Sequence, residues 1–303
     1  MAQPVALNLA AVTAAVTADQ PRVLTIPAGA GPASQPGIPS GPLSDDHQTL
    51  ERALRHWILD QAGIEVGYVE QLYTFGDLDR GRTAGYRNVA VAYLALVREA
   101  TTAHDAEWVD WYELLPWEDH RAGVPSVLME EILPALAQWS RNDDDRERRV
   151  AAAFGHGGIG FDGIRALERY ELLYEAGLVA ERFQDEGSPV PAGLTESAAM
   201  ASDHRRVVAT ALGRLRGKLT YRPVVFELLP DEFTLLDLQT TVEALAGVRL
   251  HKQNFRRLVE RTRLVEGTGR LTESTGGRPP EVFRFRPEVI LERPRPGLNV
   301  PYR

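Results

Sequence analysis

The sequence of 303 residues contains no cysteine. A disulfide framework, a thiolate metal site and a cysteine nucleophile are therefore excluded, and the fold has to be stabilised by its core. Long hydrophobic runs are also missing: no stretch approaches the roughly 20 apolar residues that cross a bilayer. The apolar segment 5–16 lacks the basic flank of a secretion signal. We therefore expect a cytoplasmic protein without a membrane partner.

Positive charge is scarce in the first two thirds of the chain. The formal net charge is -8, but residues 201–303 carry 19 Lys+Arg against 12 Asp+Glu, whereas residues 1–200 carry 15 against 30. The 44% of hydrophobic residues is typical of globular material, and the length suits about two domains. An acidic module followed by a basic one indicates nucleic-acid contact by the second module, although solvated surface arginines could produce the same asymmetry.

The N-terminal part alternates between strand and helix patterns. Two apolar runs, 5–16 and 23–26, predict a β-hairpin, and the Gly/Pro/Ser-rich segment 27–42 predicts a mobile surface loop. Ser44 is a good N-cap for a helix that Gly63 would end. The β-rich segments 68–75 and 88–97 predict two further strands. This part is therefore a mixed α/β domain.

Helical patterns dominate the middle of the chain. The aromatic cluster between Trp108 and Trp117 is expected in the core, and Pro125 opens an apolar-periodic helix that reaches Trp139. A solvated turn at 142–146 and a glycine-rich break at 157–160 follow. The break places a domain boundary near residues 150–160. Further helices are predicted over 164–178 and 198–219.

The last hundred residues give the most informative pattern. Thr234 is an N-cap with Asp237 three residues on, and Gly247 ends the helix that they begin. A second short helix over 251–262 follows a tight turn, and strand candidates at 264–266 and 281–285 come after it. Helix, turn, helix and hairpin in this order predict a winged helix.

The second helix of this unit has two different faces. Phe255, Leu258, Val259 and Thr262 fall on one side of a helical wheel. The other side exposes Gln253, Arg256, Arg257, Glu260 and Arg261, with Arg249 and Lys252 beside them. When a helix enters the major groove, arginine can form two parallel hydrogen bonds to guanine or to a phosphate, and Gln or Asn can form two to adenine. An amphipathic surface helix with solvated arginines is the alternative, and Glu260 favours it.

Several segments resemble one family. They are 71–77 (QLYTFGD), 91–93 (VAY), 218–223 (KLTYRP), 233–235 (FTL), 254–257 (NFRR), 277–279 (GRP) and 283–285 (FRF). In this order they are similar to the Nudix-related transcriptional regulators of NAD metabolism, the NrtR family. The resemblance implies an N-terminal Nudix-like α/β/α sandwich that binds ADP-ribose or a related nucleotide, and a C-terminal winged helix-turn-helix domain that binds double-stranded operator DNA, generally as a homodimer.

This resemblance also divides the chain and assigns residues. It implies a ligand-sensing domain at 1–155, a helical linker or insertion at 156–202 that simpler members lack, and a DNA-binding domain at 203–303. The implied nucleotide contacts are Gln71, Phe75, Asp77 and Arg80, each of which could equally have a structural role. DNA contacts are expected from Lys252, Gln253, Asn254, Arg256, Arg257, Arg261 and, in the wing, Arg278.

Hydrolysis by a Nudix enzyme needs the box Gly-x5-Glu-x7-Arg-Glu-x2-Glu-Glu-x-Gly, whose glutamates hold divalent metals. With Gly63 as the final glycine, the motif positions hold Gln48, His56, Trp57, Asp60 and Gln61, and the nearest opening glycine is Gly41, one residue early. Only Asp60 keeps a carboxylate. We therefore expect no Nudix hydrolysis, no catalytic residue and no metal site, and no cofactor apart from the nucleotide effector.

Two other functions remain open on the sequence. The chain could be a Nudix-type hydrolase of ADP-ribose-like nucleoside diphosphate derivatives that uses carboxylates outside the box. It could also be a scaffold whose winged helix binds protein. The leading hypothesis is a transcriptional regulator, expected to be a repressor that its ligand releases from DNA.

Overall fold

The computed structural model describes residues 4–29, 34–76, 87–155, 160–194, 199–272, 279–292 and 297–298. Seven strands within these ranges form the N-terminal sheet, with the order β3-β2-β1-β6-β5, while β4 pairs with β1 and β7 pairs with β2. Their bounds are β1 (Val5–Thr17), β2 (Gln20–Ala28), β3 (Gln35–Gly37), β4 (Ser40–Pro42), β5 (Tyr68–Phe75), β6 (Arg87–Leu96) and β7 (Glu107–Asp110). The β1–β6 pair is parallel and the other strand pairs are antiparallel.

A two-residue turn closes the predicted hairpin. Thr17 lies opposite Gln20, and Ala18 and Asp19 between them have positive φ angles of 48° and 63°. Two central residues with positive φ suit the right-handed twist of paired strands. The expected hairpin is confirmed.

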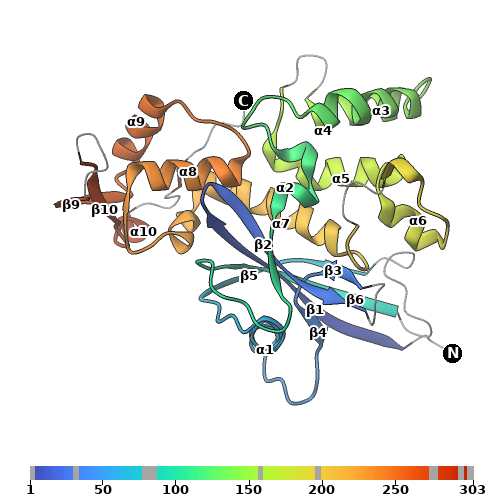
Figure 1. Ribbon diagram of the computed structural model, residues 1–303, viewed down its shortest axis with the longest axis horizontal. Helices are drawn as coiled ribbons and strands as arrows, with labels where there is room; N and C mark the ends of the chain where they lie inside the picture. Colours follow the sequence, from blue (N-terminus) through green and yellow to red (C-terminus); the bar gives the residue numbers. More distant parts are fainter. Residues whose placement is uncertain are drawn as a thin grey trace.

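Both faces of this sheet are buried. Helix α1 (Leu50–Ala62) covers one face, where Leu9 and Ala11 pack with Leu54, and α7 (His204–Tyr221) crosses the other face, as Figure 1 shows. Val12 points to the α7 side. A strand that is covered on both faces has apolar residues at consecutive positions, because every side chain is buried. This explains why β1 is almost entirely apolar. The predicted sandwich of helix, sheet and helix is confirmed.

Two local predictions in this domain were wrong. The segment 27–42 contains β3 and β4, because edge strands accept Pro and Gly as long as their backbones find partners on β2 and β1; residues 30–33 lie outside the described ranges. Ser44 does not cap α1: its hydroxyl lies 2.9 Å from His47 Nδ1 in a separate turn. Thr49 is the N-cap, and it accepts a hydrogen bond from the Arg52 N–H. The predicted end at Gly63 is confirmed, with φ 68°.

A helical middle region packs against α7. It comprises α2 (Trp111–Leu114), η2 (Pro116–Glu118), the π-helix η3 (Leu128–Ile132), α3 (Leu133–Trp139), α4 (Asp144–Phe154), η4 (Gly163–Arg165), α5 (Ala166–Glu175), α6 (Ala180–Glu186) and η5 (Ala192–Leu194). Helix α5 lies along α7. The predicted aromatic core is confirmed for Trp111, Tyr112 and Trp117, while Trp108 is half-buried. The predicted glycine break at 157–160 falls mostly outside the described residues.

The C-terminal unit is a winged helix. It contains η6 (Val224–Leu228), β8 (Glu232–Thr234), α8 (Leu235–Ala246), α9 (Lys252–Thr262), β9 (Val265–Leu271), β10 (Glu281–Phe285) and α10 (Val289–Glu292). Its strands have the order β8-β10-β9. Thr234 and Asp237 form a capping box at the start of α8, and Gly247 ends the helix with φ 71°. The predicted caps and element order are confirmed, and the centre of the wing, residues 273–278, lies outside the described part.

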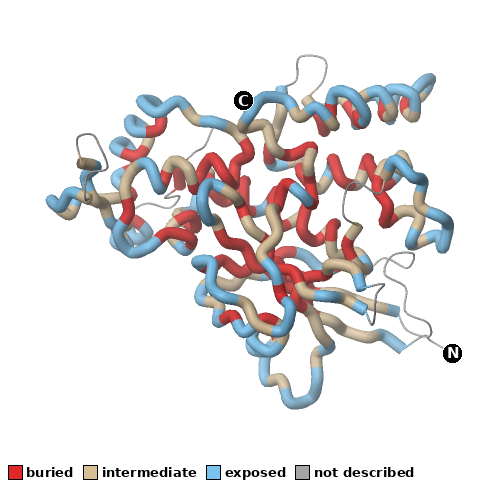
Figure 2. Tube along the Cα trace, in the orientation of Figure 1, coloured by how far each residue is buried: buried red, intermediate tan, exposed pale blue. Residues whose placement is uncertain are grey.

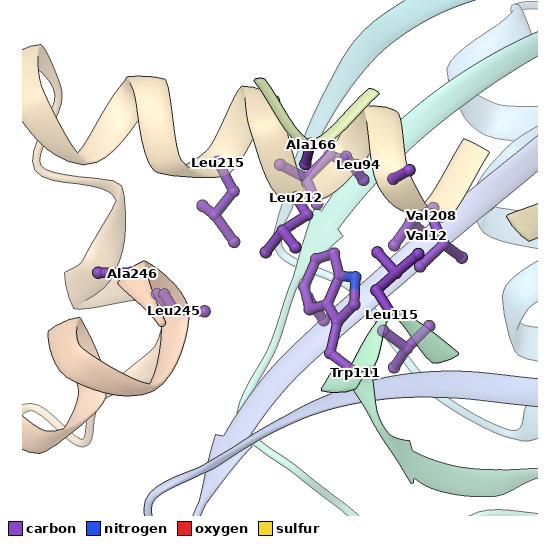
Figure 3. Packing of buried hydrophobic residues seen from close by; sticks show 14 of the residues in the cluster. Val12, Leu94, Trp111, Leu115, Ala166, Val208, Leu212, Leu215, Leu245 and Ala246 are labelled. Atoms are coloured by element: carbon purple, nitrogen blue, oxygen red, sulfur yellow. The ribbon is translucent and has the colours of Figure 1, made fainter. Parts of the chain in front are cut away.

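One continuous core joins the sheet to the winged helix. In Figure 3, Leu212 of α7 points toward Trp111 of α2, and Leu215 lies between Trp111 and the α8 residues Leu245 and Ala246. Figure 2 shows the buried trace running from the sheet through α7 to α8. A movement of α7 therefore has to change packing at both ends. In the described ranges, no helix has the length and apolar character to span a bilayer.

Candidate nucleic-acid interface and nucleotide pocket

Helix α9 divides into a buried and an exposed face. Phe255 and Val259 are 3% and 2% exposed, Thr262 is buried and Leu258 is half-buried, which anchors the helix on the winged-helix core. The predicted division into two faces is confirmed. The polar side chains on the solvent face are Lys252, Gln253, Asn254, Arg256, Arg257, Glu260 and Arg261. Their contact with DNA stays a prediction.

The electrostatics of this face favour an anionic partner. Four of its side chains are cationic, against the single carboxylate of Glu260. Arg256 Nε lies 3.1 Å from Glu260 Oε1, and both side chains are more than half exposed. An exposed ion pair of this kind contributes little to stability, so Arg256 can leave Glu260 and bind a phosphate instead. The face can therefore bind nucleic acid without breaking a buried contact.

A buried glutamate fixes the turn between α8 and α9. Glu243 accepts hydrogen bonds from Arg249 Nη1 at 2.8 Å, from the Leu250 N–H at 2.9 Å and from Gln239 Nε2 at 2.8 Å. Burial acts to raise the pKa of Glu243, but these donors hold it below its ordinary value. The ionised carboxylate thus sets the angle at which α9 leaves α8. Its role was missed in the sequence, where Glu243 looks like an ordinary helix residue.

The described part of the wing carries paired cations. Arg284 Nε lies 2.6 Å from Glu266 Oε1, and Arg270 forms an ion pair with Glu232 across the small sheet. All four side chains are exposed by more than 40%. Arg278, the predicted wing contact, lies outside the described residues. The strands of the wing therefore present arginines to solvent beside α9.

A pocket of about 210 Å³ opens on the N-terminal sheet. Strands β1, β4 and β6, the end of β5 and the start of α7 contribute its walls. The lining residues are Asn8, Leu9, Ala10, Ser40, Gly41, Phe75, Gly76, Asn88, Ala90, Ser202, Asp203, His204 and Val207. Because Ser202–His204 precede or begin α7, a ligand here would touch the helix that leads to the winged helix.

The predicted nucleotide residues fall in different places. Phe75 lines this pocket and is 6% exposed, with the Arg206 guanidinium 5.1 Å from its ring centre. Gln71 is exposed on β5 and is not part of the lining. Asp77 and Arg80 lie outside the described residues. Of the two predicted residues that the structure describes, Phe75 lines the pocket and Gln71 does not.

Polar groups in the pocket were missed in the sequence. Asn8 Nδ2 donates to Asn88 Oδ1 at 2.5 Å, so an amide pair bridges the parallel strands. His204 Nδ1 accepts the Ile38 N–H at 3.2 Å, and burial lowers the pKa of His204 to about 4. The ring is therefore neutral at pH 7, with its proton on Nε2. Two asparagines inside apolar strand patterns were the signal that could have indicated this site.

The positions of the Nudix box do not fit a metal cage. Trp57 Nε1 donates to the Pro42 carbonyl at 3.1 Å, and Gln61 bonds to both the N–H and the carbonyl of Ser40, at 2.9 Å and 2.8 Å. These side chains hold β4 against α1. Asp60 alone is an exposed carboxylate. The described residues contain no group of three or more His, Asp or Glu arranged to hold a metal ion.

Comparisons with known proteins agree with this architecture. Residues 225–285 match the model of the NrtR DNA-binding winged helix domain. The ADPR responsive transcriptional repressor NtrR of Acinetobacter baylyi is 35% identical over 86 residues, which are 28% of this chain and 34% of that protein. The match thus spans about a third of the length of this curated relative.

Two solved structures share the overall fold. Shewanella oneidensis NrtR complexed with a 27mer DNA has a TM-score of 0.58 at 20% identity, over 93% of this chain and 94% of that chain. A MutT/nudix family protein from Enterococcus faecalis has a TM-score of 0.56 at 16% identity, over 94% and 88%.

The fold combines a Nudix-like α/β sheet region with a winged helix. Residues 225–285 match a winged helix of the NrtR type, which agrees with the resemblance to the NrtR family inferred from the sequence.

Proposed function

We propose that this protein is a DNA-binding transcriptional regulator, acting as a repressor in NAD-related metabolism, whose Nudix-like domain senses ADP-ribose or a related nucleotide. The exposed basic face of α9, on an NrtR-type winged helix, carries the proposal. The names of the Acinetobacter repressor and of the Shewanella DNA complex support it. The division into 1–155, 156–202 and 203–303 belongs to the same proposal.

The regulator acts as a homodimer on a roughly palindromic operator. Two winged helices have to keep a fixed spacing to occupy two half-sites. The ligand binds the arrangement that does not fit DNA, and a preference of about 100-fold corresponds to about 2.7 kcal/mol of coupling. Helix α7 can transmit this coupling, because its first turn lines the pocket and Leu215 packs near α8.

The nucleotide binds at the pocket that contains Phe75. Asn8, Asn88 and His204 offer hydrogen bonds to hydroxyl groups, as a ribose requires. The described lining contains no Lys or Arg. We therefore place the diphosphate at the Gly76 edge, where Arg87 donates to the Gly76 carbonyl at 3.1 Å and where the chain continues toward Asp77 and Arg80. Gln71 would contact the ligand outside the enclosed part.

The same domain does not hydrolyse nucleotides. Trp57 and Gln61 stand at two ligand positions of the box and are bonded to the backbone at Pro42 and Ser40. A single carboxylate cannot hold the metal pair that activates water. ADP-ribose incubated with Mg²⁺ should release no AMP above background. Metal-dependent AMP release that is lost in Asp60→Ala would support the hydrolase instead.

The test of the regulator is binding of the full chain to DNA from its own upstream region, at two salt concentrations, with and without ADP-ribose. We expect specific, salt-sensitive binding that ADP-ribose weakens. Arg256→Ala combined with Arg257→Ala should abolish DNA binding and leave ADP-ribose affinity unchanged. Arg148→Ala is the matched control, because this arginine is 71% exposed on α4, outside the winged helix. Absence of DNA binding at low salt would favour the scaffold or the hydrolase.

A further inference from the structure

A second and larger cavity lies apart from both sites described above. Its volume is about 570 Å³, and it shares no lining residue with the pocket that contains Phe75. The helical middle region forms its walls, and the lining includes Tyr112, Glu113, Trp117, Glu131 and Ile132. Cavities of this size hold small organic molecules.

The lining combines an apolar floor with an acidic rim. Trp117 and Ile132 are 3% and 7% exposed, so they form the floor. The charged lining residues are Glu113 and Glu131, and both are exposed. Neither carboxylate forms an ion pair or a side-chain hydrogen bond with another described residue. Apolar surface below and unpaired negative charge above complement a molecule with an apolar body and a cationic end.

An unusual helix presents one of these carboxylates. Glu131 lies in the π-helix η3, in which the Leu133 N–H donates to the Leu128 carbonyl five residues back. The wider turn changes the faces on which the residues after Leu128 lie, and Glu131 and Ile132 both reach the cavity. Single π-turns inside helices occur frequently at functional sites. The π-turn thus explains how Glu131 and Ile132, which are neighbours in the sequence, both line the cavity.

The part of the lining formed by Tyr112 and Trp117 is held in place before any ligand binds. Tyr112 Oη donates to the Ala244 carbonyl of α8 at 2.6 Å, and the Arg205 guanidinium lies 5.1 Å from the ring centre of Trp117. Both rings are buried. A preformed wall loses little conformational freedom on binding, which favours affinity.

We propose that this cavity binds a small organic ammonium ion with a hydrophobic body, its charged nitrogen between Glu113 and Glu131 and its apolar part on Trp117 and Ile132. The occupant is a molecule different from the nucleotide of the proposed function.

Three probes of the same shape test the charge requirement. They are 4-phenylbutylammonium, the neutral 4-phenyl-1-butanol and the anionic 4-phenylbutyrate, titrated calorimetrically into the full-length protein at low salt. We expect the ammonium ion to bind about tenfold more tightly than the alcohol, which corresponds to about 1.4 kcal/mol. The carboxylate should not bind. Equal binding of all three, or no binding of the ammonium ion at millimolar concentration, would overturn the proposal.

Substitutions test the location. Glu131→Gln and Glu113→Gln should each weaken ammonium binding severalfold and leave binding of the alcohol unchanged. Glu130→Gln is the matched control, because it is exposed on the same π-helix but does not line the cavity. Ile132→Trp should fill the floor and abolish binding of both ligands. Ammonium affinity that is unchanged in both glutamine variants would place the bound ligand elsewhere and refute the assignment.

Discussion

Arg216 and Glu118 form an ion pair that is completely buried where the sheet domain meets the winged helix. Arg216 Nη1 lies 2.5 Å from Glu118 Oε2, and both side chains are 0% exposed. Arg169 of α5 binds the other carboxylate oxygen at 2.6 Å. Arg216 Nε also donates to the Leu245 carbonyl at the end of α8. One carboxylate therefore joins η2, α5 and α7, and Arg216 extends this junction to the winged helix.

The first prediction concerns removal of this carboxylate. Glu118→Ala leaves two buried guanidinium groups without their counter-charge, and breaking a buried pair typically costs about 3–5 kcal/mol. Urea denaturation should show a loss of this order in the free energy of unfolding. The matched control is Asp145→Ala, which removes the exposed pair with Arg148 and should cost less than about 1 kcal/mol. Equal losses in the two variants would contradict a special role for Glu118.

A second prediction follows from the neutral histidine in the pocket that contains Phe75. Burial lowers the pKa of His204 from 6.5 to about 4. Between these values the unfolded chain binds a proton that the folded protein does not, so stability falls as the pH drops from 6.5 to 4. Each pKa unit corresponds to about 1.4 kcal/mol, which makes the loss of the order of 2–3 kcal/mol.

The measurement compares unfolding at several pH values for the native protein and His204→Asn. The asparagine oxygen can still accept the Ile38 N–H that His204 Nδ1 accepts at 3.2 Å, but it does not titrate. We expect a smaller loss of stability in the variant between pH 6.5 and 4. Curves that stay parallel over this interval would show that His204 titrates normally.

The third prediction separates backbone strain from close packing at Gly247. This residue has φ 71°, and a Cβ there would lie 2.5 Å from Arg216 Nη2 and 2.5 Å from the Glu118 carbonyl oxygen. Gly187 ends α6 with φ 66° and has nothing within 4 Å of the same position. Gly187→Ala should therefore lower the free energy of unfolding only by the strain of a left-handed backbone at a non-glycine residue, about 1–2 kcal/mol.

Gly247→Ala should cost a further 1–3 kcal/mol or so, because the methyl group displaces the buried Arg216–Glu118 contact as well. Thermal unfolding of both variants gives the comparison. If the two substitutions lower the midpoint of unfolding equally, Arg216 and Glu118 can move away from the added methyl group without loss of stability. The contact between them would then be less rigid than its geometry indicates.

Local patterns in the sequence predicted the elements, and long-range contacts explain what was missed. The faces of α9 and the caps at Thr234 and Gly247 depend on residues within a few positions of one another, so periodicity was sufficient. Glu118 and Arg216 are 98 residues apart, and no local pattern pairs them. Likewise, Ser40–Pro42 looks like a loop and becomes a strand only because β1 offers a free edge there.

The candidate sites likewise combine local features, which the sequence predicted, with long-range contacts, which it did not. Exposure of the basic face followed from helical spacing, whereas Asn8 and Asn88 meet only because β1 and β6 pair in parallel. A sequence can indicate that an asparagine inside an apolar strand is unusual. It does not indicate which distant strand lies beside it.

The last prediction concerns the carboxylate on the exposed basic face of α9. Glu260 lies 3.1 Å from Arg256 and is the negative group among Lys252, Arg256, Arg257 and Arg261. Glu260→Gln removes repulsion of phosphates and releases Arg256 to bind them. We expect DNA affinity to rise severalfold at low salt and the dependence on salt to become steeper, by about one counterion.

Glu147→Gln is the matched control for that measurement, because it removes an exposed carboxylate from α4, outside the winged helix. It changes the net charge equally and should leave the salt slope unchanged. If both variants raise the affinity by the same factor, the effect comes from total charge, and α9 does not face the DNA. A decrease in affinity in Glu260→Gln alone would instead mean that Glu260 contacts a base, since Glu can accept a hydrogen bond from cytosine N4.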